Sequence, residues 1–287
     1  MKRGLSWFVF ISLILGFVFL YAPILVLIVF SFNKSKLVTV WQEFSFDSYI
    51  NLLHNQQILD AAWVSLKVAS ISATLAAILG TMCGYVLSRF SRFRGRILFL
   101  GLVSAPLVMP EVITGLAMLL MFIQLDQILQ SVFGIEPVGR GLITLIIAHT
   151  TFATAYVAVV VQSRLAGFDR SLEEAAADLG AKPYKVFFFI TLPIIAPGII
   201  AGWLLAFTLS LDDVVISDFT SGPGASTLPL VIFSKVRLGI SPEINALATI
   251  LILIVGTGII AANIIGNHRA KRERREMQIA LTEKAVP

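Results

Sequence analysis

Six long apolar runs constrain the fold of this chain more than any other feature. A helix needs about 20 mostly apolar residues to cross the hydrocarbon core of a bilayer, whereas a spanning strand is roughly half as long. Runs long enough for helices occur at residues 6–32, 68–88, 97–124, 141–161, 188–209 and 245–265. With 57% hydrophobic and 14% charged residues, the chain also lies outside the usual composition of soluble domains. We therefore predict an all-α, polytopic membrane protein with a single transmembrane domain over residues 1–287.

The positions of Lys and Arg predict how the chain is oriented, because cytoplasmic loops carry an excess of both. With the N-terminus inside, most basic residues fall on the cytoplasmic side, including the groups within 89–96, 164–185 and 269–275. The outer segments then hold few: Lys34, Lys36, Arg140, Lys235 and Arg237. Both termini and the loop at 162–187 are expected on the cytoplasmic side of the membrane. The first run has no cleavage site after it and should be retained. The basic run at 269–275 is typical of a topological anchor or a contact with membrane lipid, not of nucleic-acid binding.

The polar loop between the fourth and fifth runs contains the sequence EAAADLGAKPYKVFFFITLP, residues 174–193. Ser171 and Glu174 have the spacing of a capping box, which predicts a helix start. Gly180 suits the left-handed end of that helix, and Pro183 suits the first turn of the next one. On this pattern alone, the loop is either a surface for a partner or an ordinary amphipathic loop in which Glu174 only caps a helix. A narrow apolar stripe runs along the expected helix: Leu172, Ala175, Ala176 and Leu179.

Acidic residues in or beside the spans need a reason, because a charge at mid-membrane costs about 2.5–3.5 kcal/mol. Glu111 follows two prolines in APLVMPEVITG, and a broken helix is tolerated where it lines protein or a water-filled cavity. Glu111 therefore either lines a path for the cargo or is a structural carboxyl beside a kink in the helix. Asp212 and Asp213 are adjacent, and a cationic cargo would offset their repulsion. Alternatively, Asp213 caps a short helix while Asp212 pairs with Lys235 or Arg237.

The full spacing from Glu174 to Pro193 resembles the coupling loop of ABC importer permeases, with Glu-Ala-Ala, then Gly180, then Ile190-x-Leu192-Pro193. The segments APLVMPEVITG, FATAYVAVV, LLAFTLSLDD and residues 210–249 are similar to bacterial spermidine/putrescine permeases, most closely to the second permease subunit of putrescine transporters. The likeness covers nearly the whole chain. It implies a type I permease with six transmembrane helices and a cytoplasmic coupling helix. It also implies contacts with an ATPase at Glu174, Ala175, Ala176, Gly180, Leu192 and Pro193, and a cation path at Glu111, Asp212 and Asp213 with Trp41 at its mouth.

The resemblance implies a second permease subunit in a heterodimer, a cytoplasmic ABC ATPase dimer and a periplasmic polyamine-binding protein. The chain has no G-x-x-x-x-G-K-S/T stretch, so we assign ATP hydrolysis to the partner, and we expect no enzyme activity and no cofactor. His149 has no second ligand at metal spacing, so we interpret it as a hydrogen-bonded helix contact and propose no metal site. Tyr85 and Trp203 either contribute cation-π contacts to the path or pack in the core.

Two other functions stay open at this point. One is the same machine carrying another small cargo, such as ferric iron, an opine or a peptide. The other is a channel or intramembrane enzyme that works without an ATPase.

Overall fold

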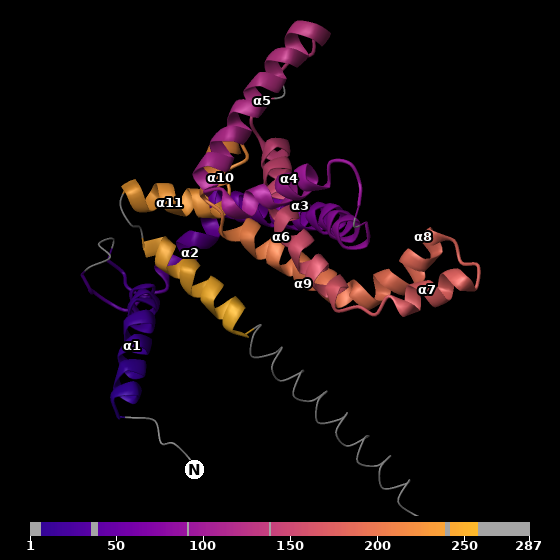
Figure 1. Ribbon diagram of the computed structural model, residues 1–287. Helices are drawn as coiled ribbons and strands as arrows, with labels where there is room; N and C mark the ends of the chain where they lie inside the picture. The colour runs from indigo at the N-terminus through magenta and orange to yellow at the C-terminus, as the bar shows by residue number, and fades with distance from the viewer. Residues whose placement is uncertain (1–6, 36–39, 91, 138, 239–241, 258–287) are drawn as a thin grey trace, which may run out of the picture. The chain divides into compact units, whose positions relative to one another are not determined.

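The computed structural model describes residues 7–35, 40–90, 92–137, 139–238 and 242–257. Within these residues all regular elements are helices, and the only strand-like interaction is an isolated bridge between Asn33 and Phe44 (Figure 1). The all-α prediction is therefore confirmed. Five stretches in the described part are long and apolar enough to cross a membrane: α1 (Trp7–Phe30), α3 (Gln56–Arg89), α5 (Glu111–Phe133), α6 (Leu142–Ala166) and Pro183–Asp212.

The helix bounds differ from the expected spans in ways that have physical causes. The expected span 97–124 is divided into α4 (Arg96–Val108) and α5, because Pro110 has no N–H and Met109 before it is extended. Helix α3 begins well before residue 68, since its first turns are amphipathic and bury Ile58, Ala61 and Ser65 on one side. Helix α5 likewise continues past residue 124 to Phe133. The sixth expected span begins within the apolar helix Pro242–Thr257, and its last residues, like the basic run 269–275, lie outside the described residues.

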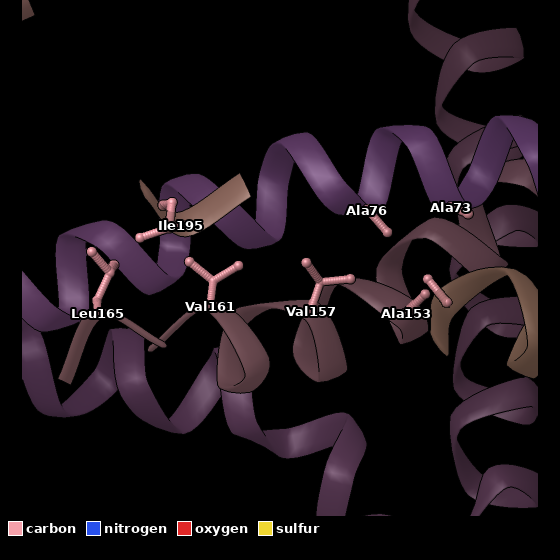
Figure 2. Close-up of a cluster of buried hydrophobic side chains, with 8 residues drawn as sticks. Ala73, Ala76, Ala153, Val157, Val161, Leu165 and Ile195 are labelled. Carbon is pink, nitrogen blue, oxygen red and sulfur yellow. The ribbon is translucent and has the colours of Figure 1, made fainter. Parts of the chain in front are cut away.

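The chain separates into two compact units, residues 56–234 and residues 1–55 with 235–287. In the first unit, α3, α6 and α9 (Leu192–Asp212) pack against one another along their lengths. Their contact is made of small and β-branched side chains, of which Figure 2 shows the part from Ala73 to Ile195. Glycine allows the close approach: a Cβ on Gly80 would lie 2.6 Å from Val157 Cβ, and one on Gly84 2.9 Å from the Ala158 carbonyl oxygen. Close packing through small residues is a common way for membrane helices to associate.

Shorter helices of this unit lie at the two ends of the bundle. At one end α6 leads into α7 (Ser171–Asp178) and α8 (Pro183–Val186), and a π-helical turn, η1 (Phe187–Thr191), leads on into α9 (Figure 1). Elsewhere α10 (Val215–Thr220) packs on α5 and α6. Helix α11 (Leu228–Leu238) begins where the Leu228 N–H donates to Ser65 Oγ at 2.7 Å.

The second unit contains α1, α2 (Asp47–His54) and the helix Pro242–Thr257. Helix α1 buries none of its residues, as expected of a helix that faces lipid on its own. Asn55 Nδ2 donates to Glu243 Oε2 at 2.8 Å and ties the end of α2 to the last helix. Aromatic rings hold the segment after α1, with Phe32 stacked on Phe44 at 5.3 Å.

Candidate functional site

The helix–turn–helix formed by α7 and α8 has the ends that the sequence predicts, apart from the first cap. Gly180 has φ +83°, and the amides of Gly180 and Ala181 donate to the carbonyls of Ala177 and Ala176. These two bonds form a Schellman motif, which closes the end of α7. Pro183 occupies the first turn of α8, as expected. The bend is therefore built by local conformational preferences.

The expected capping box of Ser171 and Glu174 is wrong. Ser171 is the first residue inside α7, and its N–H donates to Asp169 Oδ1 at 3.0 Å. Asp169 thus takes the capping role two residues upstream. The backbone N–H of Ser171, together with its hydroxyl, holds the pKa of Asp169 below its usual value.

One side of α7 is exposed and apolar. Leu179 is 90% exposed and Leu172 49% exposed, while Glu174 and Ala175 are also exposed and Ala176 is half-buried. Two exposed leucines at the helix ends with a small residue between them leave room for a close partner. The stripe predicted from the sequence is thus turned outward, except at Ala176.

Leu192 and Pro193 lie where η1 passes into α9. The Leu192 N–H donates to the Phe187 carbonyl, five residues back, which is a π-type bond. Pro193 has no N–H to continue the usual pattern, so the wider turn lets the chain continue as helix. Leu192 is half-buried and Pro193 is exposed. The structure places these two residues at the junction behind α7 and α8 and not on the outward face of α7.

A site residue that the sequence reasoning missed is Glu173, directly before the Glu-Ala-Ala triplet. Its Oε2 lies 2.9 Å from Arg89 Nε at the end of α3, and its Oε1 accepts a hydrogen bond from Thr191 Oγ1 at 2.6 Å. The side chains of Arg89 and Glu173 are only 9% and 15% exposed. From the sequence, Glu173 only lies off the apolar stripe, and its partner Arg89 is far away along the chain.

Glu111 is the first residue of α5, directly after the break at Pro110, and it is exposed. Four residues on, Gly115 lies against Phe219 of α10: a Cβ there would be 2.6 Å from Phe219 Cδ2. The expected disturbance of the helix at the two prolines is confirmed at Pro110. Asp212 ends α9 and Asp213 follows it shortly before α10, and α10 in turn contacts α5, the helix that begins at Glu111.

Of the two adjacent aspartates, Asp213 has a structural partner on each side. Its Oδ1 and Oδ2 accept hydrogen bonds from the amides of Ile216 and Ser217 at 3.1 and 2.7 Å, so it caps α10. Its Oδ2 also lies 3.4 Å from His149 Nε2, with the two side chains 6% and 2% exposed. The first part of the alternative, in which Asp213 caps a short helix, is therefore confirmed; Asp212 is exposed at the end of α9, and its pairing with Lys235 or Arg237 stays a prediction.

His149 is a hydrogen-bonded helix contact, as the sequence suggested. Its Nδ1 lies 2.7 Å from Ser210 Oγ of α9, and its Nε2 lies 3.1 Å from Ser217 Oγ of α10. In the described part of the chain no group of three or more His, Cys, Asp or Glu is placed to hold a metal ion.

The aromatic candidates are engaged in packing. Trp41 belongs to the unit of residues 1–55 and 235–287, where it meets Phe30 edge to face at 6.0 Å and is partly exposed. In the other unit Tyr85 packs on Phe187 at 4.9 Å, and Trp203 Nε1 donates to Thr74 Oγ1 at 3.1 Å.

A bundle of apolar helices that presents a short, exposed helix–turn–helix between two of its spans is the architecture of a multi-pass membrane protein with a surface that a partner can cover. Residues 76–275 match the family described as binding-protein-dependent transport system inner membrane component, and the chain belongs to this family. It is therefore a transport subunit of the inner membrane and not an enzyme. The matched residues include α7, Glu111 and both aspartates, but not Trp41.

Relatives and solved structures agree with this family. The chain is 55% identical to the putrescine transport system permease protein PotI of Escherichia coli (strain K12), over 94% of both chains. It is 40% identical to the spermidine/putrescine transport system permease protein PotC of the same organism, over 89% of this chain and 92% of that one. Its fold is similar to that of a chain in the crystal structure of a bacterial alginate ABC transporter in complex with an alginate pentasaccharide-bound periplasmic protein. That likeness has a TM-score of 0.70 and 18% identity, over 92% of this chain and 93% of the other.

Proposed function

We propose that the chain is the permease subunit of an ATP-driven polyamine importer and that putrescine is its cargo. The observation that carries this proposal is the 55% identity, over 94% of both chains, to a permease named for putrescine transport. The 40% identity to a permease named for both spermidine and putrescine makes spermidine the second candidate. The chain contributes half of the translocation path and the partner permease the other half.

The outward side of α7 is the proposed docking surface for the ATPase, with Glu174, Ala175 and Gly180 in contact and Ala176 behind them. Leu192 and Pro193 complete the region as the junction through which α7 and α8 act on α9. This arrangement is supported by the exposure of Leu172 and Leu179, which leaves an apolar surface for a partner to cover. Replacing Glu174 with Lys should abolish transport while the chain remains in the membrane. Normal uptake by this variant would remove the coupling role of the triplet.

The proposed path uses carboxylates that are open to a passing cation. Putrescine has two ammonium groups joined by a short apolar chain, so it needs spaced acidic groups and aromatic faces. Glu111 begins α5, which packs on α10, and Asp212 ends α9 shortly before α10; both are exposed, which favours them as contacts. Asp213, the next residue of the chain, is engaged by α10 and His149, so its part is to position this end of α9. Trp41 is proposed at the mouth of the path.

The assembly that we propose has four kinds of component: this permease, a different permease chain, a cytoplasmic ABC ATPase dimer and a periplasmic polyamine-binding protein. Both termini and α7 face the cytoplasm in this proposal, which is supported by the distribution of basic residues along the sequence. The whole chain acts as a single transmembrane domain surrounded by lipid.

Uptake by the assembled complex in proteoliposomes tests the cargo. Labelled putrescine should enter only with ATP and the binding protein, and unlabelled putrescine or spermidine should compete. Butane-1,4-diol has the same carbon chain without the ammonium groups and should not compete. Equal competition by the diol, or ATP-driven complexes that take up no diamine, would refute a polyamine cargo.

A further inference from the structure

The last turn of α3 is held by both α7 and the segment that leads into it. Arg89 forms the ion pair with Glu173, and its guanidinium also lies 5.3 Å from the centre of the Phe168 ring. Arg170 Nη2 donates to the Ser88 carbonyl oxygen at 2.8 Å, which places a cation at the negative end of the α3 dipole. The end of α3 is thus held against α7 and the preceding segment by side chains that do not belong to the proposed docking surface.

The same carboxylate also joins the other side of the helix–turn–helix. Thr191 of η1 donates to Glu173 Oε1 at 2.6 Å, while Arg89 Nη2 donates to that oxygen at 3.2 Å. Phe187 of η1 packs on Tyr85 of α3 at 4.9 Å. Glu173 is therefore the one side chain of α7 that bonds to both α3 and η1 in the described part of the chain.

From this geometry we infer that the Arg89–Glu173 ion pair is a positioning link that carries the movement of α7 into α3, an inference that rests on the proposed coupling to an ATPase. The outward side of α7 is open to a partner, and Glu173 holds the opposite side. Because α3 packs along both α6 and α9, a displacement of its end reaches the centre of the bundle. A largely buried, hydrogen-bonded pair such as this one holds a fixed geometry, whereas an exposed pair contributes little to stability.

The test compares single and double variants in the complete complex. Glu173→Gln or Arg89→Gln alone leaves a largely buried charge without its partner, so each is expected to lower the stability of the protein. The double variant removes both charges and should regain stability, but it lacks the link. We expect it to hydrolyse ATP in response to the binding protein while it consumes more ATP per putrescine than the wild type, because the hydrolysis is no longer coupled to movement of α3.

The matched control is an ion pair between another basic side chain and a glutamate that is exposed on both sides. Lys34 Nζ lies 3.0 Å from Glu43 Oε2, with side chains 54% and 68% exposed. Its double variant, Lys34→Gln with Glu43→Gln, should keep the ratio of ATP to putrescine of the wild type. Thr191→Val removes only one hydrogen bond from Glu173 and should give a smaller rise than the double variant at Arg89 and Glu173.

A second measurement does not depend on the cargo. Spin labels are attached at Ala177→Cys on α7 and Met82→Cys on α3, both exposed positions, after Cys83→Ser removes the native thiol. In the otherwise wild-type complex the distance between the labels should stay the same with and without trapped nucleotide, because the two helices move together. In the double variant at Arg89 and Glu173 that distance should change with nucleotide.

The two measurements separate the possible failures. An unchanged label distance in the double variant, or a wild-type ratio of ATP to putrescine, would overturn the link. If the label distance stays constant in the wild type and changes with nucleotide in the double variant, but the wild-type complex transports no diamine, the cargo is refuted and the link is still supported. Loss of all ATPase stimulation in the double variant would show that the pair supports docking and would also overturn the link.

Discussion

Gly180 offers a sharp test of how α7 works, because its backbone conformation and the space around it can each oppose a substitution, and the two effects can be measured separately. Its φ of +83° is costly for an L side chain, by about 1–2 kcal/mol for most residues, while Asn tolerates it better. A Cβ built on Gly180 meets no atom within 4 Å, so within the chain only the backbone opposes a substitution. Gly180→Ala should therefore reduce the ratio of closed to open turn about 5- to 30-fold, and Gly180→Asn should reduce it less.

Amide hydrogen exchange of α7, measured together with putrescine uptake by the complex, distinguishes strain from docking. If strain governs, Asn at this position keeps more protection and more uptake than Ala. If a partner packs closely on the turn, both variants lose uptake, and the larger Asn loses more although its amides stay protected. Wild-type protection of the Ala177 to Ala181 amides in Gly180→Ala would refute the argument from backbone strain.

Three further predictions concern packing, the path and pH. Gly80→Ala should lower the stability of the bundle by about 1–3 kcal/mol in thermal unfolding, since its Cβ would overlap Val157, whereas Gly101→Ala, which meets nothing within 4 Å, should be neutral or slightly stabilising. Glu111→Gln and Asp212→Asn should each raise the KM for putrescine about ten-fold, because a lost contact to a charged group is worth ~1.5 kcal/mol; unchanged uptake kinetics would leave both carboxylates structural. Asp169→Ala should speed exchange of the Ser171 amide at neutral pH. The folded-state pKa of Asp169 lies below 3.8, so the stabilisation of the helix start by its carboxylate is fully present above pH 3.8 and is lost as the pH falls through the folded-state pKa. The difference in exchange rate between the variant and the wild type should therefore vanish below that pKa.

The apolar centres of the helices could be predicted from the sequence, but their ends could not. Runs of apolar residues locate the parts that lipid or other helices cover on all sides. The first turns of α3 are instead amphipathic, with Ile58 buried and polar residues such as Asp60 among them, so a search for apolar runs starts too late. The break before α5 was readable because Pro110 acts locally, through its own missing N–H and the restriction on Met109.

In the candidate site too, the features with local causes could be predicted from the sequence, and the features with distant causes could not. Gly180 and Pro183 were predicted correctly since each expresses a preference of its own backbone. Which of Glu173 and Glu174 turns inward was not predictable, because it is decided by Arg89 and Thr191, which are far from them in the chain. That Asp213 caps a helix was one of the alternatives drawn from the sequence, since the amides it binds follow within four residues, whereas its contact with His149 was not predictable.

The inward anchor also explains why Glu174 and Ala175 face outward. Successive residues of an α-helix are turned by about 100°, so fixing one side chain fixes the direction of all the others. With Glu173 held against Arg89 and Thr191, Ala176 comes to lie on the same inner side and is half-buried. Glu174 and Ala175 then necessarily point away from α3, and both are exposed. The docking surface is therefore oriented by a residue outside it. A variant of Glu173 that frees the rotation of α7 should impair ATPase coupling even though every residue of the proposed docking surface is intact.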